Sequence, residues 1–468
     1  MSFEGWLVNM LNRYWRPKGR KPAGRDLVLG KTMLLDRLEP VVLREEERPM
    51  HLAVMGLTGV GKSYFLENLI RQDIDHGTGF VVFDMHGDLA DNIVAYLAER
   101  AGKDGKELDR IVVIEPFDET HTVGFNPLER GRETSAFLQA QELAHILHAR
   151  WETKSFGART EELLRMALYT LSEADLTMLE VPRLLTDEVF RRQVVGKIGE
   201  RGVRDFWEGR FELLSDRMKG AVREPLLTRL SAFLAVPQVR EIVGQRKSTF
   251  SFGKAIERGL WVVVNLSQGW LGKENAIVLG SLFFTKLELD VMAQARRPES
   301  ERRLFAVYAD EVQNVAGSNL AKLIAEGRKY RVGLTVGHQF WQQLSMEMRA
   351  AILSVGSRVV FRLNNHDAMQ LAGELDAKSK QRFVEEIGEL RQGEAIFRGG
   401  ARGAVRMHVE RHEGGKGSEE EVARVRSRSR ELYAMERRAV REDIEWRFKA
   451  RSAEGVGETR VRSEVGEI

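Results

Sequence analysis

The stretch His51-Leu-Ala-Val-Met-Gly-Leu-Thr-Gly-Val-Gly-Lys-Ser-Tyr64 decides the fold of this chain. An apolar run, Leu52 to Met55, leads directly into the pattern G-x-x-x-x-G-K-S at 56–63, and a helical pattern follows. A strand, a glycine-rich loop and a helix in this order form a phosphate loop, whose backbone N–H groups surround phosphate oxygens. The alternative is a chance glycine-rich turn, but the Lys-Ser pair at the helix start argues against it. The stretch therefore predicts a nucleoside triphosphate site.

The residue types in this loop predict separate roles. The helix N-terminus adds partial positive charge, and Lys62 has the length to reach the β- and γ-phosphates. The hydroxyl of Ser63 is suited to ligate Mg²⁺, so the expected cofactors are ATP and Mg²⁺. The residues expected to bind the nucleotide are Gly56, Thr58, Gly59, Val60, Gly61, Lys62, Ser63 and Tyr64.

Composition limits the class of protein. The 468 residues suffice for two or three domains, and the absence of cysteine excludes disulfides and thiolate metal sites. Lys and Arg total 72 against 69 Asp and Glu, so the net charge of +3 does not by itself indicate nucleic-acid binding. No apolar run is long enough to span a membrane. We therefore expect a cytoplasmic location, with the aromatic amphipathic segment Met1–Trp15 as a peripheral anchor on a membrane or a partner, or as a helix packed on the protein.

Apolar segments alternate with helical patterns on both sides of a long interruption. Continuous apolar strands separated by amphipathic helices predict an α/β fold, here a RecA-like P-loop NTPase core with a parallel sheet. Between the third strand and the later ones, leucine stripes at helical spacing predict an inserted all-helical domain. The expected organisation is an N-terminal amphipathic and lead-in region at 1–50, an ATPase core at 51–130 and 246–411, the helical insertion at 131–245 and a charged tail at 412–468. The expected core strands are 52–55, 80–83, 111–114, 261–264, 304–308, 332–336, 358–363 and a hairpin at 394–398 and 404–409.

Two acidic residues indicate hydrolysis, which a phosphate loop alone does not predict. Asp310 ends an apolar strand, where a carboxylate can hold Mg²⁺ through its water shell. Glu311, directly beside it, is suited to orient or deprotonate the attacking water. The alternative is a solvated acidic strand end, which the pairing with a phosphate loop disfavours. The pair predicts hydrolysis in addition to binding.

Polar side chains near a later strand complete the predicted site. Gln339 follows the strand 332–336, at the edge where parallel sheets bind ligands, and is placed to sense the γ-phosphate. Phosphoryl transfer gains from an arginine delivered by a neighbouring subunit. Arg328 is the preferred candidate and Arg362 the second, although a lone arginine is more often a surface residue. Lys62, Glu311, Gln339 and Arg328 form the predicted catalytic set, with Ser63 and Asp310 as metal ligands.

Five motifs in one order resemble the DNA-pumping ATPases of the FtsK/HerA superfamily, especially the coupling proteins of type IV secretion and conjugation. They are the phosphate loop 56–63, Phe83-Asp-Met-His-Gly-Asp88, Tyr308-Ala-Asp-Glu311, Gly327-Arg-Lys329 and Gly337-His-Gln339. The resemblance covers about residues 50 to 410. It implies a homohexameric ring with nucleotide between subunits, Arg328 acting in trans, Gln339 coupling nucleotide state to movement, and DNA in a central channel. The missing N-terminal membrane helices depart from the coupling proteins and put anchoring in doubt.

Two further residue patterns suggest a metal site and DNA contacts, but each also has a simple structural explanation. Asp84, His86 and Asp88 have the composition of a metal cluster, but we interpret them as a strand end and a helix cap. DNA contact would need phosphate-facing cations, for which the candidates are the stretch 210–229, with Arg217, Lys219 and Arg223, and the region around Arg398, Arg402 and Arg406. Each of these is otherwise a solvated surface.

The sequence thus predicts an ATP-driven DNA translocase of coupling-protein type that works with membrane-bound transfer machinery. One alternative is a HerA-like translocase that partners a nuclease in DNA-end processing. Another is an ATPase that acts on protein in secretion or assembly.

Overall fold

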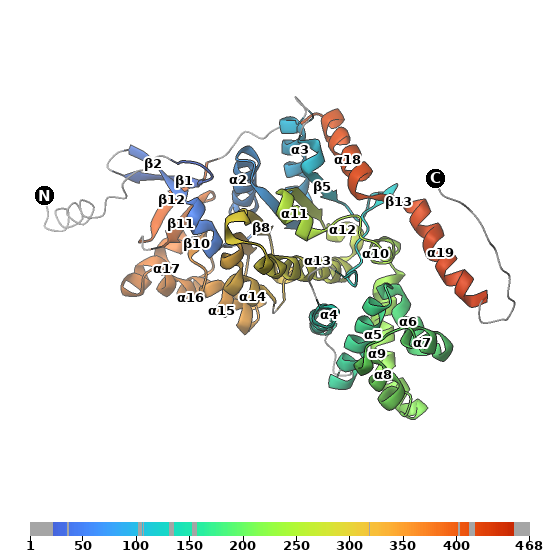
Figure 1. Ribbon diagram of the computed structural model, residues 1–468. Helices are drawn as coiled ribbons and strands as arrows, with labels where there is room; N and C mark the ends of the chain where they lie inside the picture. The colour runs from blue at the N-terminus through green and yellow to red at the C-terminus, as the bar shows by residue number, and fades with distance from the viewer. Residues whose placement is uncertain are drawn as a thin grey trace, which may run out of the picture. The chain divides into compact units, whose positions relative to one another are not determined.

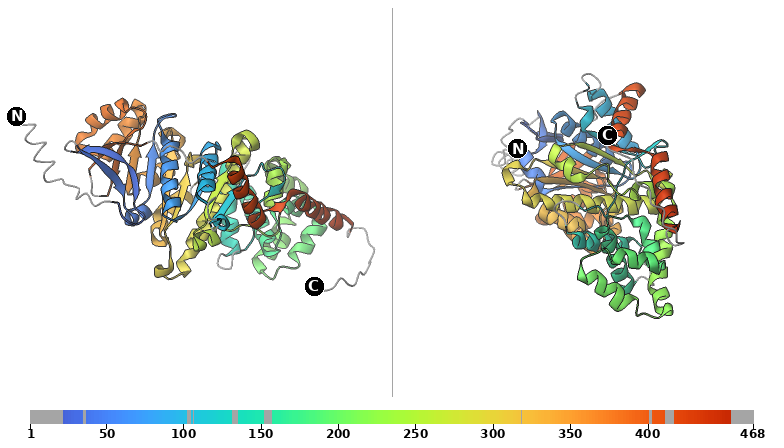
Figure 2. Two further views of the ribbon diagram at one scale, coloured as in Figure 1. Left: turned by 90° about the horizontal axis from the view of Figure 1, so that it is seen from above. Right: turned by 45° about the vertical axis from the view of Figure 1, so that its right-hand side comes forward.

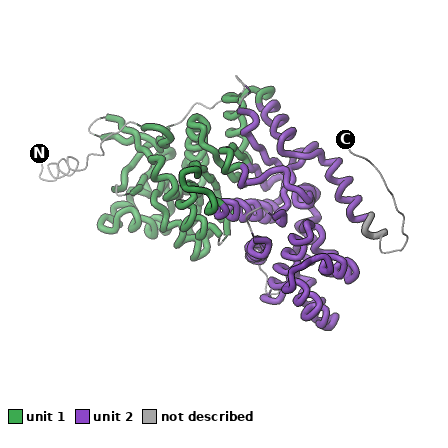
Figure 3. Tube along the Cα trace, viewed as in Figure 1, with its two compact units in different colours: residues 1–103, 255–263, 294–421 green, residues 104–254, 264–293, 422–468 purple. Residues whose placement is uncertain are grey.

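The computed structural model describes residues 22–34, 37–101, 105, 107–130, 135–151, 157–317, 319–400, 403–410 and 417–453. The predicted N-terminal segment Met1–Trp15, Arg402 and the end of the charged tail lie outside these residues. The chain divides into two compact units (Figure 3). Unit 1 comprises 1–103, 255–263 and 294–421, and unit 2 comprises 104–254, 264–293 and 422–468. The predicted domain boundaries remain a prediction.

Unit 1 is built on a large, mostly parallel sheet. Its strands run in the order β2-β1-β12-β11-β10-β3-β9-β8-β4-β7. From β10 to β4 neighbouring strands are parallel, whereas β11, β12, β1 and β2 add an antiparallel edge. The strands are β1 (Leu27–Leu34), β2 (Arg37–Leu43), β3 (Leu52–Met55), β4 (Gly79–Asp84), β7 (Trp261–Asn265), β8 (Phe305–Ala309), β9 (Val332–His338), β10 (Ser357–Val360), β11 (Glu394–Gly399) and β12 (Val405–His408).

Helices cover both faces of this sheet, as continuous apolar strands require. In Figure 1, α2 (Lys62–Asp75) and α3 (Asp88–Ala101) lie above the strands. Below them lie α14 (Asn319–Glu326), α15 (Met346–Leu353), α16 (Asn365–Leu375) and α17 (Lys380–Glu389). Every residue of β3, β4, β8, β9 and β10 is buried, which confirms the predicted α/β class with a parallel core.

Two elements of unit 1 have identifiable causes. Helix α15 begins at Met346, because the hydroxyl of Ser345 accepts a hydrogen bond from the backbone N–H of Met348 and caps the helix there. The first strand, Leu27–Leu34, was not predicted, because Gly30, Lys31 and Thr32 interrupt its apolar pattern. Pairing with β2 in a local hairpin and with the distant strand β12 forms this strand.

Unit 2 is mainly helical. Its helices between residues 136 and 243 are α4 (Ala136–Arg150), α5 (Ala158–Glu173), α6 (Val181–Thr186), α7 (Glu188–Val195), α8 (Arg201–Phe206), a π-helical turn (Trp207–Phe211), α9 (Asp216–Ala235) and α10 (Pro237–Val243). Among the described residues of that stretch no strand occurs, and α5 to α9 cluster together in both views of Figure 2. The buried Trp207 donates a hydrogen bond from its indole N–H to Thr170 Oγ1, at 2.8 Å.

The remaining elements of unit 2 come from distant parts of the chain. They are β5 (Ile111–Ile114), β6 (His121–Thr122), α12 (Gln268–Leu271), α13 (Lys273–Ala293), α18 (Glu419–Tyr433), β13 (Met435–Glu436) and α19 (Arg437–Ala453), while α11 (Phe252–Arg258) crosses between the units. The helices α18 and α19 both lie within the charged tail that the sequence predicts at 412–468. None of the helices in the described residues is long and apolar enough to cross a lipid bilayer.

Candidate nucleotide site

Three strand ends meet at one edge of the unit 1 sheet. Strand β9 pairs in parallel with β3, where His338 lies opposite Met55, and with β8, where Val336 lies opposite Ala309. The residues that follow these three strands therefore emerge side by side. They are the phosphate loop 56–63, the pair Asp310–Glu311, and Gln339.

The phosphate loop leads into α2 through Gly61, whose φ is 110°. Lys62 is buried, and its Nζ donates hydrogen bonds to the carbonyls of Gly56 at 2.6 Å and Leu57 at 3.1 Å. Burial lowers the pKa of Lys62, while the carboxylates of Asp310 and Glu311 act in the opposite direction. The ammonium group is thus bound to carbonyls at the start of its own phosphate loop, and it lies close to both acidic residues.

Ser63 and Asp310 are in direct contact. The Oγ of Ser63 donates a hydrogen bond to Asp310 Oδ2 at 2.7 Å, and the backbone N–H of Glu311 donates to Oδ1 at 3.0 Å. A hydroxyl and a carboxylate beside a phosphate loop are the oxygen donors that Mg²⁺ prefers. The two residues therefore fit the metal role that the sequence predicts for them.

Glu311 has an unusual backbone and a buried side chain. Its φ is 52°, in the left-handed region that residues other than glycine rarely adopt, and it is 5% exposed. Gln313 Nε2 donates a hydrogen bond to Glu311 Oε2 at 2.6 Å. Burial raises the pKa of Glu311 and the charge of Asp310 adds to this, whereas hydrogen bonds from Gln313 and Gln339 oppose it. Such strain and such a raised pKa are typical of functional carboxylates.

Gln339 connects two parts of the site. Its Oε1 accepts a hydrogen bond from Thr58 Oγ1 at 3.0 Å, and its side chain also hydrogen-bonds Glu311. Gln339 thus touches both the phosphate loop and the acidic pair.

The two candidate arginines lie at opposite ends of the parallel strands. Arg328 is exposed in the 3₁₀ turn Gly327–Tyr330, which precedes β9. It therefore lies at the N-terminal ends of the strands, away from the phosphate loop at their C-terminal ends. Arg362 follows β10, and its carbonyl accepts a hydrogen bond from the N–H of Leu57 at 3.0 Å. Only Arg362 is therefore near the site of its own chain.

Asp84, the last residue of β4, caps the start of α3. The carboxylate of Asp84 accepts hydrogen bonds from the backbone N–H groups of His86, Gly87 and Ala90, each at 2.9 Å. Burial raises the pKa of Asp84, and these N–H groups oppose the rise. In the part of the chain that the structure describes, no cluster of three or more His, Asp or Glu side chains could hold a metal ion. Asp84 ends β4, as the sequence predicts, and its own carboxylate supplies the cap that was expected from His86 and Asp88.

Two residues of the site gave little signal in the sequence. His338 is 1% exposed, and neither ring nitrogen has a hydrogen-bond partner; burial, assisted by the charge of Lys62, lowers its pKa to about 3. Gly393 precedes β11, and its N–H bonds the phosphate loop carbonyl of Val60 at 3.1 Å. A glycine before a hairpin strand is too common to mark such a contact from sequence alone.

Most of the predicted DNA-contacting cations already have other partners. Lys219 pairs with Glu212 at 2.8 Å, Arg223 with Glu224 at 3.3 Å and Arg406 with Glu394 at 2.8 Å. Arg398 Nη1 donates to the carbonyls of Glu374 and Leu375 and so caps the C-terminus of α16. Arg217 is exposed and remains the candidate with no ion pair among the described residues.

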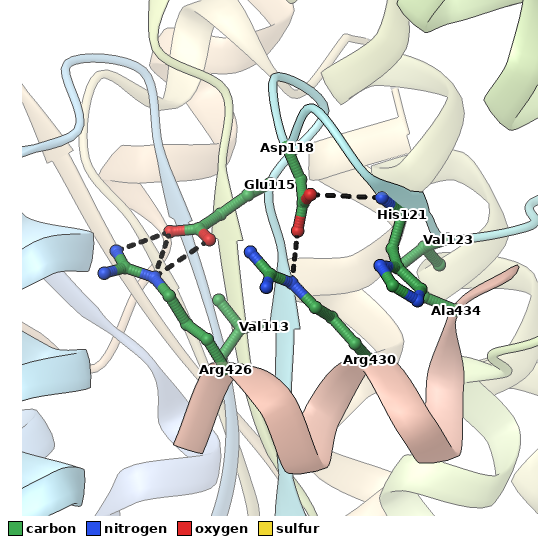
Figure 4. A pocket seen from close by; sticks show the side chains of 8 residues that line it. All are labelled: Val113, Glu115, Asp118, His121, Val123, Arg426, Arg430 and Ala434. Carbon is green, nitrogen blue, oxygen red and sulfur yellow. Dashed lines mark hydrogen bonds and ion pairs between the residues drawn. The ribbon is translucent and has the colours of Figure 1, made fainter. Parts of the chain in front are cut away.

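Unit 2 contains a hollow of about 20 Å³ beneath α18, large enough for one water molecule. Figure 4 shows that its charged groups face each other: Arg426 Nη2 pairs with Glu115 at 2.8 Å, and Arg430 Nε pairs with Asp118 at 2.5 Å. These pairs join the helix to the segment after β5. The hollow is therefore a packing feature of the C-terminal helices.

Comparisons with known proteins agree with this geometry. Residues 29–156 match the family model "Helicase HerA, central domain". A search by sequence among curated proteins gives no match.

Solved structures share the fold at low sequence identity. The unbound bacterial conjugative coupling protein TrwBdeltaN70 has a TM-score of 0.57 and 18% identity, over 88% of this chain and 93% of that chain. TrwB in complex with ADP and Mg²⁺ also has a TM-score of 0.57 and 18% identity, over the same shares of both chains. VirB4 of Thermoanaerobacter pseudethanolicus has a TM-score of 0.53 and 14% identity, over 84% of this chain and 98% of that chain. The chain thus shares the P-loop NTPase fold of these structures, and its residues 29–156 match the central domain of helicase HerA.

Proposed function

We propose that this chain is an ATP-dependent DNA translocase that works as a homohexameric ring and moves DNA during conjugation or secretion, as a coupling protein would. The observation that carries the proposal is the continuous set of contacts from Ser63 to Asp310 and from Glu311 through Gln339 to Thr58. These contacts join a phosphate loop, an acidic pair and a polar residue on a third strand. The structures of TrwB, a conjugative coupling protein, in complex with a non-hydrolysable ATP analogue and with ADP and Mg²⁺ support the choice of ligands.

The residues divide the chemistry of hydrolysis among them. Lys62 binds the β- and γ-phosphates after leaving the carbonyls of Gly56 and Leu57, and Ser63 and Asp310 hold Mg²⁺. When bound, the metal neutralises charge that develops on the phosphoryl oxygens. Glu311 accepts a proton from the attacking water, a role that its raised pKa favours. The remaining loop residues, from Gly56 to Tyr64, surround the phosphates.

The position of Arg328 supports a site completed by a neighbouring subunit. In its own chain this exposed side chain lies at the sheet edge opposite the phosphate loop. An arginine placed there can reach only the nucleotide of another copy, where it would stabilise transition-state charge. Arg362 is the second candidate for this role. It ranks below Arg328 because it lies beside the phosphate loop of its own chain.

ATP turnover with and without DNA tests the proposal. We expect DNA to stimulate hydrolysis, and Lys62→Ala to remove hydrolysis with and without DNA. Arg217→Ala should weaken the stimulation more than Arg223→Ala, because Arg223 already pairs with Glu224. Hydrolysis that is indifferent to DNA, or that survives in Lys62→Ala, contradicts the proposal.

The match of residues 29–156 to the HerA central domain favours a second candidate, a HerA-like translocase that partners a nuclease in DNA-end processing. Co-purification with a nuclease would support it, and association with membrane-bound transfer machinery would support the first. An ATPase that acts on protein in secretion or assembly is a further alternative. Stimulation of ATP hydrolysis by a protein partner, without any response to DNA, would identify that function.

A further inference from the structure

Two distant segments hold the phosphate loop by main-chain hydrogen bonds. The N–H of Leu57 donates to the carbonyl of Arg362 at 3.0 Å, and the carbonyl of Val60 accepts from the N–H of Gly393 at 3.1 Å. Gly61 lies beside the second bond, since a Cβ on it would be 3.8 Å from the nitrogen of Gly393. The loop is thus held at one side by Arg362, two residues after the end of β10, and at the other by Gly393, the residue before β11.

Gly393 lies in a tight turn that requires its residue type. The turn is closed by a hydrogen bond from the N–H of Glu394 to the carbonyl of Arg391, at 3.0 Å, and the Glu394 carboxylate accepts from the N–H of Arg391 at 2.8 Å. The φ of Gly393 is +82°, a conformation that glycine adopts without steric cost and other residues rarely adopt. This backbone conformation accompanies the N–H bond to the phosphate loop.

The same residue also contacts the second strand of the hairpin. The carbonyl of Gly393 accepts a hydrogen bond from the N–H of Val409 at 2.8 Å, just after β12. Nearby, Asn68 of α2 donates from Nδ2 to the carbonyl of Glu410 at 3.0 Å. The phosphate loop and the helix that follows it are therefore tied to the same end of the β11–β12 hairpin.

We propose that Gly393 is a positioning residue for the phosphate loop, and that through it the β11–β12 hairpin responds to nucleotide at that loop. The inference rests on the proposed binding of a triphosphate by residues 56–63. Phosphate oxygens draw the N–H groups of the loop toward them, so the Val60 carbonyl must change position with the loop. Because hydrogen bonds weaken steeply beyond their normal distance, the Gly393 turn either follows the loop or restrains it. In both cases nucleotide affinity depends on Gly393.

The glycines at the two ends of β11 provide a matched pair of variants. Gly393 and Gly400 both have positive φ, +82° and +56°, and a Cβ would meet its nearest atom at 3.5 Å and 3.3 Å respectively. Alanine therefore strains the backbone at both sites, but only Gly393 bonds the phosphate loop. We expect Gly393→Ala to weaken binding of a non-hydrolysable ATP analogue about tenfold and Gly400→Ala by no more than about twofold, at similar melting temperatures. Equal affinities of the two variants would overturn the inference.

Amide hydrogen exchange on the unmodified full chain gives an independent test. With the ATP analogue and Mg²⁺, the amides of Gly393 and Val409 should exchange more slowly, as should those of the phosphate loop. In Lys62→Ala none of these amides should respond. Protection of the loop without any change at Gly393 and Val409 would refute the inference and leave the proposed function intact. A loop that shows no protection would refute the proposed function itself.

Discussion

At the residue scale, burial sets the chemistry of the candidate site. Lys62, Asp310 and Glu311 are each about 5% exposed, although side chains of these types are almost always solvated. They tolerate burial because they lie near one another with opposite charges and with hydrogen-bond partners. The consequence is a lowered pKa for Lys62 and a raised pKa for Glu311.

Glu311→Gln should separate binding from hydrolysis. The amide keeps the size of the side chain but cannot accept a proton, so we expect hydrolysis to fall by about 100-fold or more while ATP affinity stays near that of the unmodified protein. Single-turnover hydrolysis and equilibrium binding would measure the two effects. Glu326→Gln, at a partly exposed residue away from the loop, is the control. Near-normal hydrolysis by Glu311→Gln would exclude this residue as the base.

His51 should make the stability of unit 1 depend on pH. Its Nδ1 accepts from the N–H of Leu334 at 3.1 Å, and its Nε2 bonds the carbonyl of Ile324 at 2.9 Å. Burial lowers its pKa from 6.5 to about 4. Between these values the unfolded chain binds the proton and the folded chain does not, so stability is complete above pH 6.5 and falls as the pH drops toward 4.

The loss attributable to His51 is at most roughly 3 kcal/mol, the free energy of a shift of this size. We expect the melting temperature to fall over this pH range, and the slope to flatten in His51→Gln but not in His366→Asn, which changes an exposed histidine. A slope that His51→Gln leaves unchanged would assign the effect to other groups.

At the element scale, β9 organises the site by its close approach to β8. A Cβ on Gly337 would lie 2.8 Å from Asp310 Oδ1, closer than real Cβ atoms come to other atoms. His338, the last residue of β9, lies beside Met55 of β3. Gln339, which follows it, accepts a hydrogen bond from Thr58. One strand thus fixes the acidic pair and the phosphate loop relative to each other.

Gly337→Ala should therefore displace Asp310 and impair the metal contribution to the site. We expect the apparent affinity for Mg²⁺ in the ATPase assay to fall about tenfold or more, because the carboxylate must move to admit the methyl group. Gly333→Ala is the matched control on the same strand, where a Cβ would meet the carbonyl oxygen of Arg48 at 3.1 Å, away from the site. If both variants lose stability equally and neither changes the Mg²⁺ dependence, the close approach has no role in metal binding.

At the scale of the whole molecule, the two units have different bases of stability. Unit 1 relies on a sheet whose buried strands are apolar, whereas the C-terminal helices of unit 2 are attached largely through arginine–carboxylate pairs. Arg447 pairs with Glu180 at 3.2 Å and Arg437 with Glu241 at 2.5 Å, all four nearly fully buried. Removing one partner of such a pair leaves a buried charge and is strongly destabilising.

Mixed assemblies test whether the site requires a second copy of the chain. Arg328→Ala and Lys62→Ala should each be inactive alone, and mixing them should restore part of the ATPase activity, because a Lys62→Ala subunit still presents Arg328 to its neighbour. Arg331→Ala, which changes a nearby exposed arginine that pairs with Glu45 at 3.3 Å, should remain active. Mixtures without any recovered activity would contradict the trans role.

The sequence by itself determined the parallel core and identified most residues of the candidate site. Continuous apolar strands, the phosphate loop and Asp310–Glu311 carry their structure in local pattern, because strand burial and loop geometry depend on nearby residues. The tertiary structure alone decided what distant segments do: that β1 exists as a strand, that Gly393 and Arg362 hold the phosphate loop, that Arg398 caps a helix, and that Arg328 lies at the far edge of the sheet. These contacts join residues tens to hundreds of positions apart, and a register or a capping bond between such residues leaves no periodic signal in the chain.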